Sequence, residues 1–551
     1  MSSASDSDLF PHKIEMSAAV GKQTTDGHSA ASLTRTELSK PMGSQEVAPP
    51  GINPNEQHLC TDHLLDDLKG RSVSGGIVTV MSQGIQFTLT LGSTMVLARL
   101  LTPRDFGLVA MVWTVMGFLR VFREAGLSTA TVQREGITHA QVSNLFWVNV
   151  LVSIAISLLV VAVAPAIAWF YREPRLLKIT LALSVTFLLT GLSVQHLAIL
   201  NRQMRFKTIA LIQIGSVTVG VLVGIGMAWL KCDYWSLVGM NVATSLIALL
   251  LTWSASGWRP QLFTRHSGTR PLVHFGASLT AGSFFYSLAR GLDGLLIGRV
   301  YGAFSTGLYS RASTLLARPL QQAISPIEAV FIPALSRLQS QPDRYRRTFL
   351  QIYEAVAMVG CLLTGMCFAL ARPLTLVVLG PKWEGAAIIF AGFTFAALQY
   401  PLTTSATWLF VSQGRGRDAF LAGSIISVII AGSFAAGLPY GPAGVAIAYS
   451  CSCLLVQMPV MYWLAGRSGP VRRIDLWIAF LKYLPVWGIV SSAALLARLA
   501  IPDSHPFEEL LVATPCGLLA GVAFIFAYSP ARRAALNLLS ALHGFKSRHL
   551  S

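Results

Sequence analysis

Residues 272–331 read LVHFGASLTAGSFFYSLARGLDGLLIGRVYGAFSTGLYSRASTLLARPLQQAISPIEAVF, and this hairpin decides the fold. Its first arm, Leu272–Ile297, is apolar enough to cross a bilayer, and Thr306–Val330 follows after a short turn. At helical spacing each arm carries polar side chains along one face. The first face holds Ser283, Tyr286, Ser287, Arg290, Asp293 and Gly294; the second holds Arg311, Thr314, Arg318, Gln321, Ser325 and Glu328.

Two polar faces turned toward lipid would be hard to tolerate, because an arginine at the bilayer centre costs about 2.5–3.5 kcal/mol. We therefore expect the two faces to line a water-filled cavity or to face each other. Asp293 can pair with Arg290 or Arg311, and a buried structural ion pair explains this residue equally well. One carboxylate cannot neutralise three arginines, so the expected cavity has surplus positive charge and suits an anionic substrate.

The composition indicates an all-α polytopic membrane protein. The chain has 551 residues, of which 12% are charged, and its mean hydropathy is +0.57. A soluble domain of this size could not bury so much apolar surface. The net charge of +17 comes from short loops between apolar segments, which argues against a nucleic-acid partner. The seven cysteines show no metal-ligand spacing and no ATP-binding motif is present, so we expect no metal and no cofactor.

About fourteen segments are long and apolar enough to span a membrane, and the loops between them are short. The first six are Gly75–Leu97, Phe106–Ala125, Asn144–Phe170, Leu176–His196, Ile209–Leu230 and Trp235–Trp253. After the two hairpin arms come Phe349–Ala371, Ala386–Val411, Ala419–Leu438, Pro442–Leu464, Leu476–Ala497 and Glu509–Tyr528. If the N-terminus is cytoplasmic, the inner loops hold about twenty Lys and Arg against about nine outside. We therefore expect both termini to be cytoplasmic.

An internal repeat appears when the chain is shifted by 200 residues. Arg99 then falls on Arg299, and Gly107 falls on Gly307. The first copy carries only neutral polar groups on this face: Gln83, Gln86, Thr90 and Ser93 stand where the second copy has Ser283, Tyr286, Arg290 and Asp293. A repeat of six helices predicts two pseudo-symmetric lobes related by an axis along the membrane normal.

The repeat divides the chain into four parts. Residues 1–70 are expected to be a disordered acidic tail with a short amphipathic piece, Leu59–Leu68. Residues 71–260 form the first six-helix lobe and residues 261–466 the second. Residues 467–551 add two extra helices and a basic C-terminal tail.

The stretch ARLLTPRDFGLVAM (residues 98–111) resembles a signature of the polysaccharide-exporter branch of the MOP flippase superfamily. That branch includes Wzx-type flippases and the colanic acid and teichuronic acid exporters. Further stretches resemble the same branch: GLSTATVQR (126–134), SNLFWVN (143–149), FIPALSRLQ (331–339) and GPAGVAIAY (441–449). The resemblance covers roughly residues 69–466, whereas the acidic tail departs from the short start usual in this family.

The resemblance implies a flippase that moves an undecaprenyl-pyrophosphate-linked oligosaccharide across the bacterial inner membrane. Two lobes would rock around a central cavity in a monomer, with the polymerase and chain-length regulator of the same pathway as further partners. The candidate cavity residues are Arg290, Arg311, Arg318, Asp293, Gln83, Gln86, Gln321 and Tyr286. Forked, permanently charged arginines suit a pyrophosphate or an acidic sugar.

Two further basic groups have competing interpretations. Arg120 and Arg123 could capture substrate at the cytoplasmic end, although snorkelling to the membrane surface explains them as well. The loop QGRGRD (residues 413–418) looks suited to phosphate, but no strand precedes it, and we expect a tight inner turn.

Two other classes of protein share this hydropathy. A membrane glycosyltransferase, polymerase or ligase would commonly display catalytic groups on a large outer loop, which this sequence lacks, so we expect no enzyme. A multidrug or ion antiporter of the MATE type would favour buried acids over the arginines seen here. The flippase interpretation is therefore preferred.

Overall fold

The computed structural model describes residues 68–123, 128, 131–132, 136–264, 270–501, 505–529 and 531–532. Within these ranges, side chains are not described at residues 68–69, 71–73, 120–123, 270–288, 323, 326 and 329–330. The expected acidic tail up to residue 67, its amphipathic piece and the basic tail beyond residue 532 lie outside the described residues.

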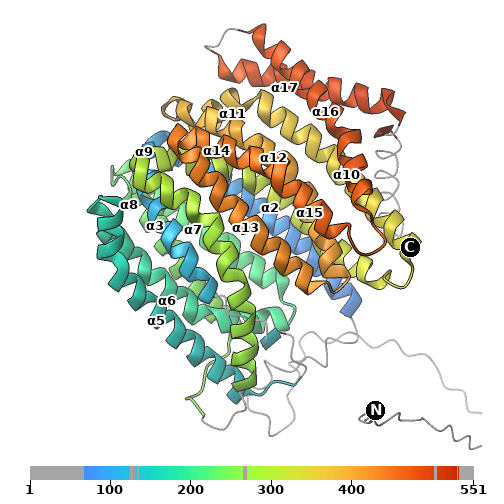
Figure 1. Cartoon of the computed structure of the whole chain (residues 1–551). Coiled ribbons are helices and arrows are strands. Elements are labelled where there is room, and N and C mark those ends of the chain that lie inside the picture. The colour runs from blue at the N-terminus through green and yellow to red at the C-terminus, as the bar shows by residue number, and fades with distance from the viewer. Residues whose placement is uncertain are drawn as a thin grey trace, which may run out of the picture. The chain divides into compact units, whose positions relative to one another are not determined.

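The described residues form helices connected by short turns, in the order predicted (Figure 1). The first lobe contains α2 (Leu68–Leu100), α3 (Pro103–Arg123), α5 (His139–Tyr171), α6 (Arg175–Arg202), α7 (Phe206–Trp229) and α8 (Trp235–Ser256). The second contains α9 (Arg270–Arg337), α10 (Pro342–Ala369), α12 (Glu384–Ser412), α13 (Gly416–Gly437), α14 (Gly441–Ser452) and α15 (Met458–Ala465), with a π-helical segment, η4 (Cys453–Gln457), between the last two. The short elements α11 (Ala371–Leu379), η2 (Pro381–Trp383) and η3 (Leu438–Tyr440) lie at turns, and α16 (Arg473–Leu499) and α17 (Pro506–Ala527) follow.

The long helix α9 is the predicted hairpin. Its backbone leaves helical geometry at Gly302, where φ is 76° and ψ is −174°. Glycine adopts this left-handed conformation without steric penalty, so the chain can reverse there. We call residues 303–337 the second arm of α9. With α9 divided in this way and α14–α15 taken as one crossing, the described residues contain the fourteen predicted crossings.

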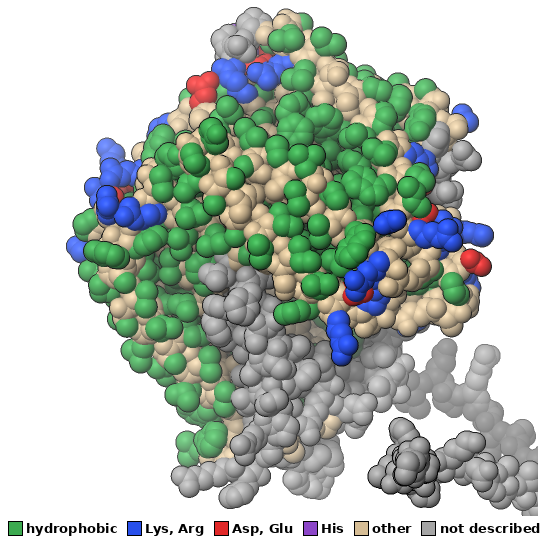
Figure 2. Space-filling view, in the orientation of Figure 1, with side chains coloured by type: hydrophobic (Ala, Val, Ile, Leu, Met, Phe, Trp, Pro, Cys, Tyr) green, Lys and Arg blue, Asp and Glu red, His purple; other side chains and the backbone are tan. Residues whose placement is uncertain are grey.

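The helices present an apolar surface suited to lipid. Nine helical stretches among the described residues are long and apolar enough to cross a membrane, one of them continuous over Gly416–Ala465. Figure 2 shows Lys and Arg in separate patches, with hydrophobic side chains covering most of the face between them. Large side chains such as Leu151 (67% exposed) and Trp229 (74% exposed) point outward. Exposure of this kind is expected where lipid replaces water. The polytopic all-α prediction is confirmed.

The two lobes repeat the same packing. In the first lobe α5 packs on α6, α7 on α8, α6 on α8, and α2 on α7. The corresponding pairs in the second lobe are α10 with α12, α13 with α14, α12 with α14, and α9 with α13. Sequence duplication and packing therefore agree on two six-helix lobes.

Matched arginines show how the repeat register changes along the chain. Arg205 precedes α7 and donates from Nη1 to the carbonyl of Ala255 at 3.0 Å. Arg415 precedes α13 and donates from Nη1 to the carbonyl of Ala465 at 2.9 Å. Their backbones match as well, with φ and ψ of −81° and 55° against −85° and 57°. The shift here is 210 residues rather than 200, because the second lobe inserts α11 before α12.

The lobes meet where α3 crosses the second arm of α9. A Cβ atom added to Gly107 would lie 1.7 Å from the carbonyl oxygen of Ala303. A Cβ atom added to Gly307 would lie 1.8 Å from the carbonyl oxygen of Pro103. Both pairs differ by the repeat shift of 200, so the crossing is symmetric. Only glycine allows the two backbones to come this close.

The two extra helices attach to the second lobe, where α16 packs on α10 and α17 packs on α11 and α16 (Figure 1). Arg498 on α16 pairs with Glu509 on α17, its Nε lying 2.7 Å from Oε2 of the fully buried carboxylate. Lys482 on α16 lies 2.8 Å from Glu354 on α10. Paired charges between apolar helices fix the contact geometry of α16 and α17.

Candidate functional site

Two cavities border the second arm of α9, on opposite sides of this helix. The small cavity, about 40 Å³, lies between the lobes and is bounded by Arg311, Arg318 and side chains of α2 that include Thr90 and Thr94. The large cavity, about 620 Å³, lies inside the second lobe between α9, α12, α13 and α14–α15. The sequence predicted one polar cavity, whereas the structure divides its residues between two.

Arg311 is the central side chain of the small cavity. Its guanidinium carbon lies 4.9 Å from the centroid of the Phe106 ring, which supports the cation from one side. Its Nε atom is buried and has no hydrogen-bond partner in the described structure. A buried donor without a partner costs about 1–3 kcal/mol. An anionic acceptor within reach of this Nε would offset that cost.

Arg318 adds a second positive charge to the same cavity, two helical turns further along the second arm of α9. Its side chain is exposed, and its charge repels that of Arg311. Among the described residues, no Asp or Glu lines this cavity, and neither arginine forms an ion pair with a described carboxylate. An anion entering here would bind two forked donors and relieve their repulsion.

Asp293 lies apart from this pair. Its carboxylate accepts hydrogen bonds from the Tyr309 hydroxyl at 3.1 Å and from the Gly294 amide at 2.7 Å. The charge that acts on it most directly is that of Arg290. Of the two pairings considered from the sequence, the electrostatic interaction found is the one with Arg290.

Arg290 and Gln321 line the large cavity rather than the small one. The sequence placed Gln321 on the same face as Arg311 and Arg318. In the structure, Ala317 and Gln321 border the large cavity, and the two arginines border the small one. Helical spacing alone groups residues on a stripe, but it does not reveal that neighbouring helices divide the stripe.

The remaining predicted residues lie outside both cavities or outside the described side chains. Gln86 donates from Nε2 to Oε1 of Gln213 on α7 at 3.1 Å, a contact within the first lobe. Gln83 is half-buried on α2 and lines neither cavity. The side chains of Tyr286, Arg120 and Arg123 are not among those described.

Sequence reasoning missed Phe106 beneath Arg311 and Tyr309 beside Asp293. Phe106 lies inside the 98–111 signature, so its position was available as a signal. Sequence reasoning also missed the polar side chains that α12 contributes to the large cavity. The repeat shift of 200 misaligns α6 with α12, which hid them.

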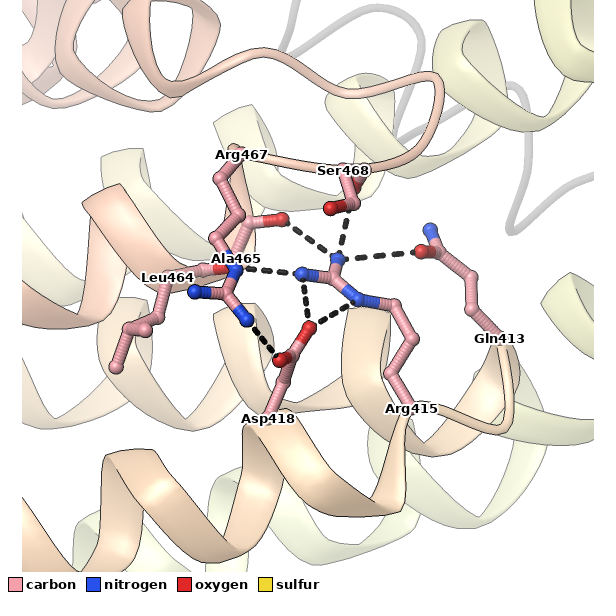
Figure 3. A network of polar contacts seen from close by, with 7 residues as sticks. All are labelled: Gln413, Arg415, Asp418, Leu464, Ala465, Arg467 and Ser468. Atoms are coloured by element: carbon pink, nitrogen blue, oxygen red, sulfur yellow. Dashed lines mark hydrogen bonds and ion pairs between the residues drawn. The ribbon is translucent and has the colours of Figure 1, made fainter.

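The phosphate-like loop before α13 is a tight turn, as predicted (Figure 3). The Arg415 guanidinium donates hydrogen bonds to carbonyl oxygens at and just beyond the end of α15, namely those of Leu464, Ala465 and Ser468, at 2.7, 2.9 and 2.8 Å. Its Nε also donates to Asp418 at 2.8 Å, and Arg467 pairs with the same carboxylate. Arg415 therefore caps a helix end, where a cation is favoured.

Residues 96–388, more than half of the chain, match the family model described as "Polysaccharide biosynthesis protein". The lipopolysaccharide biosynthesis protein WzxC of Escherichia coli (strain K12) is 23% identical over 429 residues, covering 76% of this chain and 86% of the relative. The succinoglycan biosynthesis transport protein ExoT of Rhizobium meliloti (strain 1021) is 26% identical over 429 residues, covering 77% and 84%. The lipid II flippase MurJ, in an inward closed conformation, superposes with a TM-score of 0.65 at 15% identity, covering 82% of this chain and 98% of that one.

Proposed function

Because this chain belongs to the polysaccharide biosynthesis protein family, we propose that it carries a lipid-linked oligosaccharide across the bacterial inner membrane. The substrate is an undecaprenyl-pyrophosphate-linked repeat unit for an exopolysaccharide or an O-antigen-type glycan. The two lobes move around the site between them in alternating access. Relatives named for polysaccharide biosynthesis and transport support this assignment.

The observation that carries the proposal is the Arg311–Arg318 pair in the small cavity. Two guanidinium groups without a described carboxylate partner lie between the lobes, and one of them has a buried, unpartnered donor. A pyrophosphate offers several acceptor oxygens and at least two negative charges, which match these donors. Phe106 holds Arg311 from behind, so less ordering is needed when the anion binds.

The same geometry separates this proposal from its rivals. A cationic drug would be repelled by two arginines, which disfavours a MATE-like drug exporter. A glycosyltransferase, polymerase or ligase is disfavoured because the described turns between crossings are short and carry no large outer domain.

The loop-charge asymmetry supports cytoplasmic termini. A polymerase and a chain-length regulator of the same pathway are the protein partners we propose, and the chain acts as a monomer.

The test is polysaccharide export by cells that carry Arg311→Gln, Arg318→Gln or both at native expression. We expect the double variant to abolish export and to accumulate lipid-linked repeat units, with protein in the membrane at wild-type level. Each single variant should retain part of the activity, because one forked donor remains. Cell-surface glycan and extracted lipid-linked intermediates are measured together.

The matched control is Arg104→Gln. Arg104 is 53% exposed and pairs with Glu173 at 3.0 Å at the end of α5, outside both cavities. Such a surface pair contributes about 0–1 kcal/mol, so export should be unchanged. Wild-type export by the Arg311→Gln/Arg318→Gln double variant would exclude the small cavity from the transport path.

A further inference from the structure

The large cavity differs in chemistry from the small one. Its volume of about 620 Å³ falls within the range of small-molecule sites, about 300–1,000 Å³. Its polar lining consists of amides, hydroxyls and one arginine: Arg290, Ser313, Gln321, Gln399, Thr403, Thr404, Thr407 and Gln457. Apolar side chains make up the rest of the walls, among them the rings of Phe393, Tyr400 and Tyr449. Amides and hydroxyls beside aromatic faces are suited to a neutral, hydroxyl-rich ligand.

The duplicated lobe provides an internal comparison. With the shift of 210 fixed by Arg205 and Arg415, Gln399, Thr404 and Thr407 of α12 stand where α6 has Leu189, Val194 and Leu197. The remaining two α12 positions, Tyr400 and Thr403, stand opposite Thr190 and Ser193 and are polar in both lobes. The same helix packing thus forms in the first lobe with apolar side chains at three of these positions. Their polarity in the second lobe is not needed for packing.

The polar groups are arranged to accept as well as donate. The Thr403 hydroxyl donates to the carbonyl of Gln399 at 3.2 Å, and the Thr407 hydroxyl donates to the carbonyl of Thr404 at 2.6 Å. Each hydroxyl donates its single hydrogen to a carbonyl of its own helix, so its oxygen lone pairs remain available to accept hydrogen bonds from a ligand in the cavity. Arg290 and the side-chain amide of Gln321 supply donors on the opposite wall. Sugar hydroxyls, which both donate and accept, satisfy such a mixed lining.

Charge separates the two cavities further. Arg290 acts on the carboxylate of Asp293, so this cation has a nearby countercharge, whereas Arg311 and Arg318 repel each other. The small cavity therefore attracts an anion, and the large one does not need one. The cavities lie on opposite sides of one helix that is about 10–12 Å across, so a substrate that fills both has to run around this helix and must be longer than one sugar ring.

We propose that the large cavity of the second lobe binds a sugar ring of the oligosaccharide while the small cavity binds its pyrophosphate. This inference rests on the proposed function. It assigns Gln399, Thr404 and Thr407 to glycan recognition, so the second lobe would determine which sugar is bound.

The first test uses thiol protection in a variant without native cysteines. Ala317→Cys places a thiol in the large cavity, and Thr94→Cys places one in the small cavity. Labelling rates are compared in membranes from cells that make the lipid-linked repeat unit and from cells that lack the enzyme adding its first sugar phosphate. We expect the repeat unit to slow labelling at both positions.

Two outcomes of this comparison overturn the inference. Protection of Thr94→Cys alone would remove the sugar from the large cavity and leave the transport proposal standing. Protection at neither position would contradict both.

The second test separates sugar from anion on purified full-length protein. A panel of methyl hexosides should slow labelling of Ala317→Cys, and inorganic pyrophosphate should slow labelling of Thr94→Cys. The triple variant Gln399→Leu/Thr404→Val/Thr407→Leu copies the first lobe and should lose the hexoside effect but keep the pyrophosphate effect. If that variant is absent from the membrane, Thr407→Leu alone carries the test. Protection of Ala317→Cys by pyrophosphate and by no hexoside would make the large cavity an anion site instead.

Discussion

At the scale of single residues, Arg311 and Arg498 are both half-buried arginines with opposite roles. Arg311 has an unpartnered Nε atom and a like charge for a neighbour, Arg318. Arg498 binds the fully buried Glu509 at 2.7 Å. Its carboxylate partner explains the place of Arg498 between apolar helices, whereas Arg311 has no carboxylate partner among the described residues, as expected of a group that binds an anionic substrate.

This contrast predicts substitution effects of opposite sign. Arg311→Met removes an uncompensated charge and keeps contact with the Phe106 ring, so the free energy of unfolding should stay equal or rise by about 1–4 kcal/mol. Arg498→Met removes the nearer cation from the buried Glu509 and leaves only Arg372, 3.8 Å away, so the free energy of unfolding should fall by up to about 3–5 kcal/mol. Thermal unfolding of the purified proteins in detergent measures both. Export should be reduced with Arg311→Met despite its stability, as with Arg311→Gln, because only Arg318 remains to bind the anion. Destabilisation by Arg311→Met comparable to that by Arg498→Met would make Arg311 a structural residue.

At the scale of elements, the crossing of α3 with the second arm of α9 depends on Gly107 and Gly307. An alanine methyl at either position would meet a backbone carbonyl at less than 2 Å, and a backbone cannot move aside as a flexible side chain can. In the alternating access that we propose, the two lobes move against each other at this contact, so its packing should affect export as well as stability.

Alanine substitution tests this contact. Gly107→Ala and Gly307→Ala should each lower the free energy of unfolding by about 1–3 kcal/mol, as overpacking does, and should impair export. Gly117→Ala, on the same helix with no atom within 4 Å of its added Cβ, is the matched control and should be neutral or stabilising by up to about 1 kcal/mol. Thermal unfolding and export report the effects. Equal behaviour of all three variants would show that the crossing tolerates separation.

The helices themselves were predictable from sequence, and their partners were not. The length of the apolar segments was enough to predict every crossing. The helix His139–Tyr171 extends beyond the predicted Asn144–Phe170, because polar residues continue the helix past its apolar stretch. Helical spacing in the hairpin was enough to predict that Arg311 and Arg318 share a face. The distribution of the polar residues between two cavities depends on which helices pack on each side of α9, and spacing does not show this. The contact between Arg498 and Glu509 joins two helices, and no local pattern signals such a pair.

At the scale of the whole molecule, the two duplicated lobes share one helix arrangement, and they differ in the side chains that line the cavities. Both lobes share helix packing, the arginine before the fifth helix and the glycine crossing. The cavity arginines of the second-lobe hairpin have no counterpart in the first lobe: Arg290 stands where the first lobe has Thr90, Arg311 where it has Met111, and Arg318 where it has Phe118. The account therefore describes a transporter whose two halves move alike while one half carries most of the recognition.

The central claim is that this protein moves the lipid-linked repeat unit from the cytoplasmic to the outer leaflet. The most direct measurement is the labelling of that glycan in spheroplasts by a membrane-impermeant sugar-oxidising reagent, before and after depletion of the protein. The account predicts that depletion removes the labelled fraction while total lipid-linked repeat unit rises, and that wild-type protein, but not Arg311→Gln/Arg318→Gln, restores labelling. An unchanged labelled fraction in depleted cells would contradict it.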